Sequence, residues 1–268
     1  MAGSLDGKSV IVTGADVGVG LAIARKCTEY GARVMMTSNN DEKLQDECDV
    51  LCRAGGTAAC FAGDLSQKLT IANLLSTTID TNDRIDVLIN ASRDMQSSDP
   101  FDPDNSVFEA LIKSNVMTPL RLTQHVVRKV TQLQESNPDV PALQAVVNIG
   151  SIAARRTLPE LMAYSVASAA LDQMTRSMAA AFAKQGTRVN GIALGSVMSG
   201  SLHAALQDRE GLQESLTAVT PLGRIGDADE AAEVAVFLAS DAASFVTGQI
   251  IAVDGGRTIL DPMQVPAH

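Results

Sequence analysis

The chain has 268 residues, of which 46% are hydrophobic and 19% are charged, and its formal net charge is −10. This length and composition are typical of a globular protein that buries enough apolar surface to fold without a disulfide or a metal. The acidic balance repels phosphate backbones, so nucleic acid is excluded as an expected partner. We see no apolar run of about 18 residues and no signal-peptide pattern. We therefore expect no membrane partner and a cytoplasmic location.

The four cysteines are Cys27, Cys48, Cys52 and Cys60. Cys48 and Cys52 are four residues apart and can share a helix face, which leaves a metal or redox pair open. No histidine lies nearby, and the spacing is not Cys-x-x-Cys. Reduced thiols, with no metal site, are the better interpretation.

Short apolar runs alternate with helix-period segments along nearly the whole chain. The predicted strands cover residues 10–12, 33–37, 58–62, 87–89, 145–149, 188–194 and 249–253. The predicted helices cover residues 21–30, 41–54, 66–82, 107–135, 163–184 and 229–239, and the fourth is expected to bend near Pro119. This alternation indicates βαβ units. The expected fold is α/β, a Rossmann-type doubly wound, seven-stranded parallel sheet with helices on both faces, in one domain over residues 1–268.

The least regular segments are residues 93–105 and 196–220, which follow the fourth and sixth predicted strands. Open α/β sheets bind ligands at the carboxyl ends of their strands. We therefore predict that both segments are loops that cover a substrate.

A glycine-rich turn, TGADVGVG over residues 13–20, joins the first strand to the first helix. Glycines let the backbone approach a pyrophosphate, and the helix N-terminus supplies free amides with a partial positive charge. Glycines also make ordinary turns. The position of this one, directly after the first strand, favours dinucleotide binding over a purely structural turn.

The spacing Thr-Gly-x-x-x-Gly-x-Gly in this turn resembles that of the short-chain dehydrogenases/reductases. The resemblance continues in order along the chain, through GDL at 63–65, DVLINASR at 86–93, LGSV at 194–197, PLGR at 221–224 and VDGG at 253–256. Within residues 90–93 only Asn90 matches the family's Asn-Asn-Ala-Gly motif, and Leu194 replaces a usual proline. The resemblance implies a cofactor site made of Thr13, Gly14, Gly18, Gly20, Ser38, Asn39, Asp64, Leu65, Asn90, Gly195 and Val197, with Asp64 against the adenine ring.

The choice between NAD and NADP depends on the end of the second strand. A carboxylate there favours a free ribose hydroxyl, whereas a nearby arginine accepts a 2′-phosphate. The acid position is Ser38 and the basic position is Asn39, so neither discriminator is present. Asp16 slightly disfavours extra negative charge, but the sequence leaves both cofactors open.

The resemblance also implies a catalytic group. Ser151 and Tyr164 have the family's 13-residue spacing, and Asn115 falls where the family places its catalytic asparagine. In this family the tyrosine hydroxyl exchanges a proton with the substrate oxygen, which the serine holds. A lysine four residues after the tyrosine favours the ionised tyrosine and grips the nicotinamide ribose. Here that position is Ser168, and the nearest lysine of the predicted helix is Lys184.

A serine hydroxyl carries no charge with which to stabilise a phenolate. Ser168 can still hydrogen-bond a ribose or a water linked to Asn115. Losing a positioned acid/base partner typically costs on the order of 10²–10⁴ in rate. We therefore expect nucleotide binding to survive the replacement better than turnover does.

Arginines follow the fourth and fifth strands, at the expected cofactor edge. One hypothesis is that Arg93 supplies the missing positive charge, although a solvated loop arginine is the favoured interpretation on sequence alone. Arg155 and Arg156 offer another hypothesis, contact with an acidic substrate.

Two classes of function follow. The preferred one is an NAD(P)(H)-dependent oxidoreductase that interconverts a secondary alcohol and a ketone, with activity impaired by Ser168. The alternative is a catalytically inactive nucleotide-binding sensor or a regulatory or structural subunit. The resemblance further implies a homodimer or homotetramer that pairs helices 107–135 and 163–184. The run MAAA at 178–181 permits close helix packing, either between subunits or within one.

Overall fold

Seven parallel strands form the centre of the computed structural model, which describes residues 4–104 and 107–261. The strand order is β3-β2-β1-β4-β5-β6-β7, so the direction of winding reverses between β1 and β4. This arrangement confirms the predicted fold class. The strands are β1 (Ser9–Thr13), β2 (Arg33–Ser38), β3 (Thr57–Ala62), β4 (Val87–Asn90), β5 (Ala145–Ser151), β6 (Arg188–Leu194) and β7 (Ile250–Val253).

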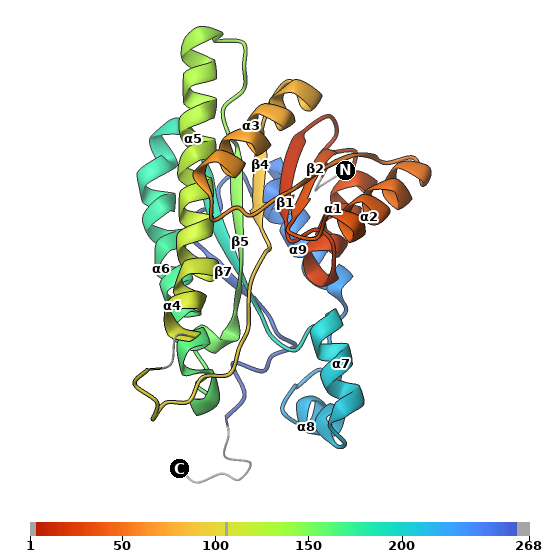
Figure 1. Cartoon of the computed structure of the whole chain (residues 1–268), viewed down its shortest axis with the longest axis vertical. Coiled ribbons are helices and arrows are strands. Elements are labelled where there is room, and N and C mark those ends of the chain that lie inside the picture. The colour runs from red at the N-terminus through yellow and green to blue at the C-terminus, as the bar shows by residue number, and fades with distance from the viewer. Residues whose placement is uncertain (1–3, 105–106, 262–268) are drawn as a thin grey trace.

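Helices cover both faces of the sheet (Figure 1). One core cluster joins the sheet to α1 (Gly18–Glu29), α2 (Asp41–Arg53) and α9 (Ala228–Ala239). A second cluster, on the other face, joins it to α3 (Lys68–Asn82), α5 (Thr118–Ser136) and α6 (Met162–Phe182). The central strands are buried throughout because both of their faces are covered.

The strand register brings the functional segments to one edge. Thr13 pairs with Thr37, Asn90 pairs with Asn148, and Ser151 pairs with Leu194. All are at or near the carboxyl ends of parallel strands. The β1–β4 boundary, where the winding reverses, is where such sheets leave room for a ligand.

The predicted helix over 107–135 is interrupted. It consists of α4 (Val107–Ile112), a π-helical turn over Lys113–Met117, and α5. Pro119 stands in the first turn of α5, and a proline offers no N–H to the carbonyl four residues before it. The chain accommodates this with the wider π turn, so the irregularity precedes Pro119 and the prediction of a bend was only approximate.

The segment 196–220 is not the loop that we predicted. It contains α7 (Gly200–Asp208) and α8 (Leu212–Ala218), which lie away from the sheet at its lower right in Figure 1. The side chain of Ser199 caps α7 by accepting a hydrogen bond from the Leu202 amide. Residues 93–104, by contrast, contain no helix or strand. None of the described helices is long and apolar enough to cross a membrane.

Candidate active site

The glycine turn between β1 and α1 has a backbone that a ligand can approach closely. Gly14 and Gly18 have φ of 63° and 56°, a region that disfavours side chains. A Cβ on Gly20 would lie 2.1 Å from the Gly14 carbonyl oxygen. No side chain from Val17 caps α1. The first-turn amides of α1 are therefore not capped by the residue before it, as a phosphate-binding helix end requires.

A groove of about 530 Å³ opens beside this turn. Its lining includes the predicted cofactor residues Thr13, Gly14, Ser38, Asn39, Asp64, Leu65 and Asn90. Thr37 also lines it, and the Thr37 Oγ1 atom is buried without a hydrogen-bond partner in the described part of the chain. A buried hydroxyl without a partner is costly, so this atom favours a polar ligand in the groove. The open volume, the glycine turn and Thr37 together fit a dinucleotide.

The end of β2 carries no charge that selects a nucleotide. The Ser38 hydroxyl accepts a hydrogen bond from the Asn40 amide at 3.0 Å, and Asn39 is exposed. Asn40 in turn caps α2. Neither position presents a carboxylate or a cation, so the structure leaves the choice between NAD and NADP as open as the sequence did.

Asp64 and Leu65 form the wall of the groove after β3. The Asp64 carboxylate accepts hydrogen bonds from the amide and the hydroxyl of Ser66, both at 2.8 Å. These bonds favour the ionised form and hold the pKa of Asp64 below its usual range. The wall is therefore a fixed turn with a negative charge, next to a buried leucine.

Side chains tie the strand ends together at this edge. Thr13 Oγ1 accepts hydrogen bonds from the amides of Ala91 at 3.0 Å and Ser92 at 2.9 Å. Asn90 Nδ2 donates to Asn148 Oδ1 at 2.8 Å. Sequence reasoning missed Asn148, although an asparagine inside a run of buried apolar residues is a visible signal. These bonds fix β1, β4 and β5 relative to one another.

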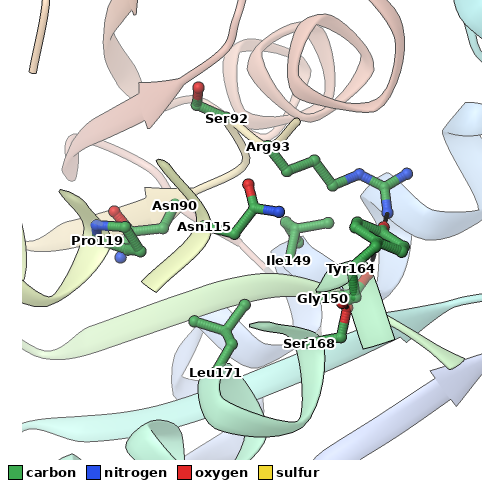
Figure 2. Close-up of a pocket in the computed structure, with 10 residues that line it drawn as sticks. All are labelled: Asn90, Ser92, Arg93, Asn115, Pro119, Ile149, Gly150, Tyr164, Ser168 and Leu171. Atoms are coloured by element: carbon green, nitrogen blue, oxygen red, sulfur yellow. Dashed lines mark hydrogen bonds between the residues drawn. The ribbon is translucent and has the colours of Figure 1, made fainter. Parts of the chain in front are cut away.

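A second and much smaller pocket, of about 10 Å³, adjoins the groove around Tyr164. Figure 2 shows its lining of Asn90, Ser92, Arg93, Asn115, Pro119, Ile149, Gly150, Tyr164, Ser168 and Leu171. The Arg93 side chain crosses the pocket, and its Nη1 atom donates hydrogen bonds to Tyr164 Oη at 3.0 Å and to the Gly150 carbonyl at 3.3 Å. Arg93 is half-buried, so the favoured interpretation of it as a solvated loop residue was wrong.

Asn115 reaches this pocket from the π turn. Its Oδ1 accepts a hydrogen bond from the Asp94 amide, and its Nδ2 donates to the Asp94 carbonyl, both at 2.8 Å. The asparagine thus holds both backbone polar groups of Asp94, the residue after Arg93. Both hydrogen-bonding groups of the side chain are engaged by protein.

Ser168 and Ser151 are engaged by the backbone. Ser168 lies on α6 one turn after Tyr164, and its hydroxyl donates to the Tyr164 carbonyl at 2.8 Å. Ser151 Oγ accepts from the Ala153 amide at 3.1 Å and starts a short 3₁₀ turn. Ser151 ends β5 at the same sheet edge but is not among the residues that line the Tyr164 pocket.

The remaining predicted residues lie elsewhere. Gly195 packs against Asp254, and Val197 pairs with Gly226, so neither is among the residues lining the groove. Arg156 donates to the carbonyls of Thr258 and Leu260, and Arg155 donates to the carbonyl of Ile250. These two guanidiniums hydrogen-bond the C-terminal part of the chain, and their contact with an acidic substrate stays a hypothesis.

The fold and the site define a class of protein: doubly wound α/β proteins with a glycine turn at the winding reversal and a tyrosine pocket beside it. Comparison with known families agrees, because a family model described as enoyl-(acyl carrier protein) reductase matches residues 14–258. The chain belongs to the short-chain dehydrogenase/reductase family of oxidoreductases.

Similar proteins match nearly the whole chain. An uncharacterised oxidoreductase of Thermotoga maritima is 31% identical over 258 residues, covering 95% of this chain and 99% of its own length. The 7α-hydroxysteroid dehydrogenase of Escherichia coli K12 is 29% identical over 252 residues, covering 94% of each chain.

Two solved structures of similar proteins contain nicotinamide nucleotides. A gluconate 5-dehydrogenase from Burkholderia cenocepacia in complex with NADP and tartrate has a TM-score of 0.86 and 29% identity, and covers 97% of this chain and 98% of its own. A 7α-hydroxysteroid dehydrogenase complexed with NADH and 7-oxo glycochenodeoxycholic acid has a TM-score of 0.87 and 28% identity, and covers 95% of this chain and 96% of its own.

Proposed function

We propose that the protein is an NAD(P)(H)-dependent oxidoreductase that interconverts a secondary alcohol and a ketone. The observation that carries this proposal is the adjacency of groove and pocket: Asn90, Ser92 and Pro119 line both. A nucleotide held at the glycine turn would therefore extend toward the Tyr164 hydroxyl. The names of the relatives, which include dehydrogenases with NADP or NADH bound, support the same reaction class.

Different residues would bind the cofactor and transfer the proton. The turn at Gly14–Gly20 and the end of α1 would hold the pyrophosphate, Thr37 a ribose hydroxyl, and the Asp64–Leu65 wall the adenine. The bound nicotinamide supplies the hydride acceptor or donor. Tyr164 would take the hydroxyl proton from an alcohol as the hydride leaves carbon, or return it to a ketone oxygen in the reverse direction.

The test is a titration with NADH and NADPH, followed through nicotinamide fluorescence. The chain has no tryptophan, so the protein contributes little background. We expect micromolar binding of at least one nucleotide, then turnover with a panel of ketones and secondary alcohols. Failure of both nucleotides to bind at millimolar concentration would sink this function.

One observation favours a second candidate, a nucleotide-binding sensor without turnover. The Ser168 hydroxyl is turned back onto its own helix, and only about 10 Å³ remains free beside Tyr164. A sensor would bind NADH or NADPH in the groove but reduce no carbonyl compound. Binding without turnover across the panel would select it.

We also propose a homodimer or homotetramer. Met178 and Ala179 pack inside the subunit, whereas Ala180 and Ala181 on the same helix are exposed and leave a small-residue surface for a second copy. Light scattering of the purified protein gives the mass. A monomer at micromolar concentration would remove this proposal without affecting the reaction.

A further inference from the structure

Arg93 lies in the loop after β4, at a position that departs from the family motif, and its guanidinium points toward Tyr164. We propose that Arg93 is a catalytic residue that supplies, from the β4 loop, the positive charge that the family's lysine supplies from α6. The inference rests on the proposed oxidoreductase function and names the group that makes it possible without a lysine. In the sequence, position 93 has gained a cation where the resembled motif has glycine, and position 168 has lost one.

The contact has the geometry of a charge-assisted hydrogen bond. Arg93 Nη1 lies 3.0 Å from Tyr164 Oη and 3.3 Å from the Gly150 carbonyl oxygen. Tyr164 is 4% exposed, so little water competes for its hydroxyl. A guanidinium donates only and stays protonated at all ordinary pH values. In such a site it stabilises a phenolate oxygen more than a neutral phenol.

The backbone of Arg93 is held on both sides. Thr13 Oγ1 accepts hydrogen bonds from the two backbone amides that precede Arg93. Asn115 hydrogen-bonds the backbone N–H and C=O of Asp94, which follows Arg93. Thr13 and Asn115 are themselves buried, at 2% and 5% exposure. The guanidinium is therefore aimed before any substrate arrives, as a preorganised electrostatic contribution requires.

No other cation lines the pocket in the described part of the chain. Arg93 and Tyr164 are its only titratable lining residues. Asp172, on α6, lies behind Gly150, where an ideal Cβ on the glycine would be 3.7 Å from Asp172 Oδ1. Arg155 and Arg176 face Asp172 and partly offset its charge. Lys184 lies beyond the far end of α6.

The proposed step balances without a further reactant. In oxidation, the hydride leaves the carbinol carbon for the nicotinamide, and the hydroxyl proton passes to the phenolate of Tyr164. In reduction, Tyr164 gives its proton to the carbonyl oxygen while the hydride arrives at carbon. Arg93 neither gains nor loses a proton and holds the phenolate oxygen in both directions.

The first test needs neither substrate nor nucleotide. The chain has only two tyrosines, Tyr30 and Tyr164, and no tryptophan, so a Tyr30→Phe protein reports Tyr164 alone by phenolate absorbance. We expect phenolate to form at a higher pH in Tyr30→Phe/Arg93→Met than in Tyr30→Phe. The exposed Arg53→Met is the matched control and leaves the midpoint in place. Equal midpoints with and without Arg93 would overturn the proposal.

The second test uses turnover. Arg93→Met is expected to lower kcat by about 10²-fold while nucleotide affinity stays within about twofold. Arg93→Lys, or Ser168→Lys added to Arg93→Met, should restore part of the rate, and the acid limb of the pH–rate profile should move to higher pH when the charge is lost. An Arg93→Met enzyme as fast as or faster than the parent would mean that Arg93 only plugs the pocket, and would refute the role.

The proposed reaction and the proposed role of Arg93 can be refuted independently. If Arg93 governs the phenolate midpoint but the parent protein turns over no substrate, the reaction is wrong and the Arg93–Tyr164 pairing stands. If the parent turns over substrate and Arg93→Met does so equally well, the reaction stands and the role of Arg93 is wrong.

Discussion

The groove at the glycine turn and the pocket at Tyr164 share one sheet edge but differ in volume and in how their polar groups are hydrogen-bonded. The groove is open, about 530 Å³, and the Thr37 hydroxyl in its wall has no partner in the described chain. The pocket holds about 10 Å³, and Arg93 hydrogen-bonds the Tyr164 hydroxyl in it. Thus a polar group of the groove, where a ligand is expected, has no hydrogen-bond partner in the described chain, whereas Arg93 and Tyr164 of the pocket, where the reaction is expected, are hydrogen-bonded to each other.

This difference leads us to expect nucleotide binding in the groove and the proposed reaction in the pocket. Seven of the predicted cofactor residues line the groove, whereas two departures from the family pattern, Arg93 and Ser168, line the pocket. On our proposal, the nucleotide site is kept while the charge beside Tyr164 comes from the β4 loop and not from α6. Variants on either side of the boundary should affect one property and spare the other.

The largest expected effect is in the pocket. Tyr164→Phe removes the hydroxyl that we propose exchanges the proton, so we expect a loss of about 10²–10⁴ in kcat with NADH affinity unchanged. Tyr30→Phe is the matched control, because Tyr30 bonds Glu233 away from the site. Steady-state rates and fluorescence titration measure the two properties, and a fully active Tyr164→Phe would remove the tyrosine from the mechanism.

The converse variant breaks the groove. A Cβ on Gly20 would meet the Gly14 carbonyl oxygen at 2.1 Å, so Gly20→Ala must displace the phosphate turn. We expect nucleotide affinity to fall at least about tenfold, or ~1.4 kcal/mol. Gly226→Ala, where the nearest heavy atom is an ordinary 3.5 Å away, is the control. Parental affinity in Gly20→Ala, by titration with NADH, would show that this turn does not carry the phosphate.

A smaller effect concerns the carboxyl group behind the pocket. Burial raises the pKa of Asp172 above its ordinary value, against the partial opposition of Arg155 and Arg176. The native state therefore holds this proton more tightly than the unfolded chain, and stability falls as pH rises from the ordinary aspartate pKa through the raised one. Asp172→Asn should raise Tm at neutral pH and not at low pH.

The exposed Asp139→Asn makes the same chemical change without burial and serves as the control for Asp172→Asn. Melting curves at acid and neutral pH provide the measurement. A lower Tm for Asp172→Asn at neutral pH would show that the ionised carboxylate is satisfied by partners and does not cost stability.

The smallest effect, with the opposite sign, lies at the groove wall. The hydrogen bonds from Ser66 lower the pKa of Asp64, so the stability that they contribute is present above the ordinary aspartate pKa and is lost as pH falls through the lowered one. Asp64→Ala should slightly weaken nucleotide binding at neutral pH and make the melting temperature less sensitive to acid. A wild-type acid profile in Asp64→Ala, compared with Ser66→Ala, would contradict this.

Sequence reasoning found the sheet and the groove more readily than the pocket. The buried strand runs and the glycine turn are local patterns, and the predicted cofactor residues around Thr13, Ser38 and Asp64 do line one groove. The short helices α7 and α8, of nine and seven residues, were missed because helices of two to three turns give little periodic signal. Gly195 and Val197 were placed from motif resemblance. Gly195 packs against Asp254 and Val197 pairs with Gly226, and their part in cofactor binding stays a prediction.

By itself, the sequence determined the α/β fold, the family and the absence of a lysine four residues after Tyr164, because strand and helix periods and motif spacings are properties of the chain alone. Only the tertiary structure decided where the Arg93 side chain points. Its direction depends on Thr13 at the end of β1, Asn115 in the π turn and Gly150 in β5, which are far apart in sequence. A loop arginine has many rotamers in isolation. Thr13 and Asn115 hold the backbone on either side of Arg93, and the Gly150 carbonyl and the Tyr164 hydroxyl accept hydrogen bonds from its guanidinium.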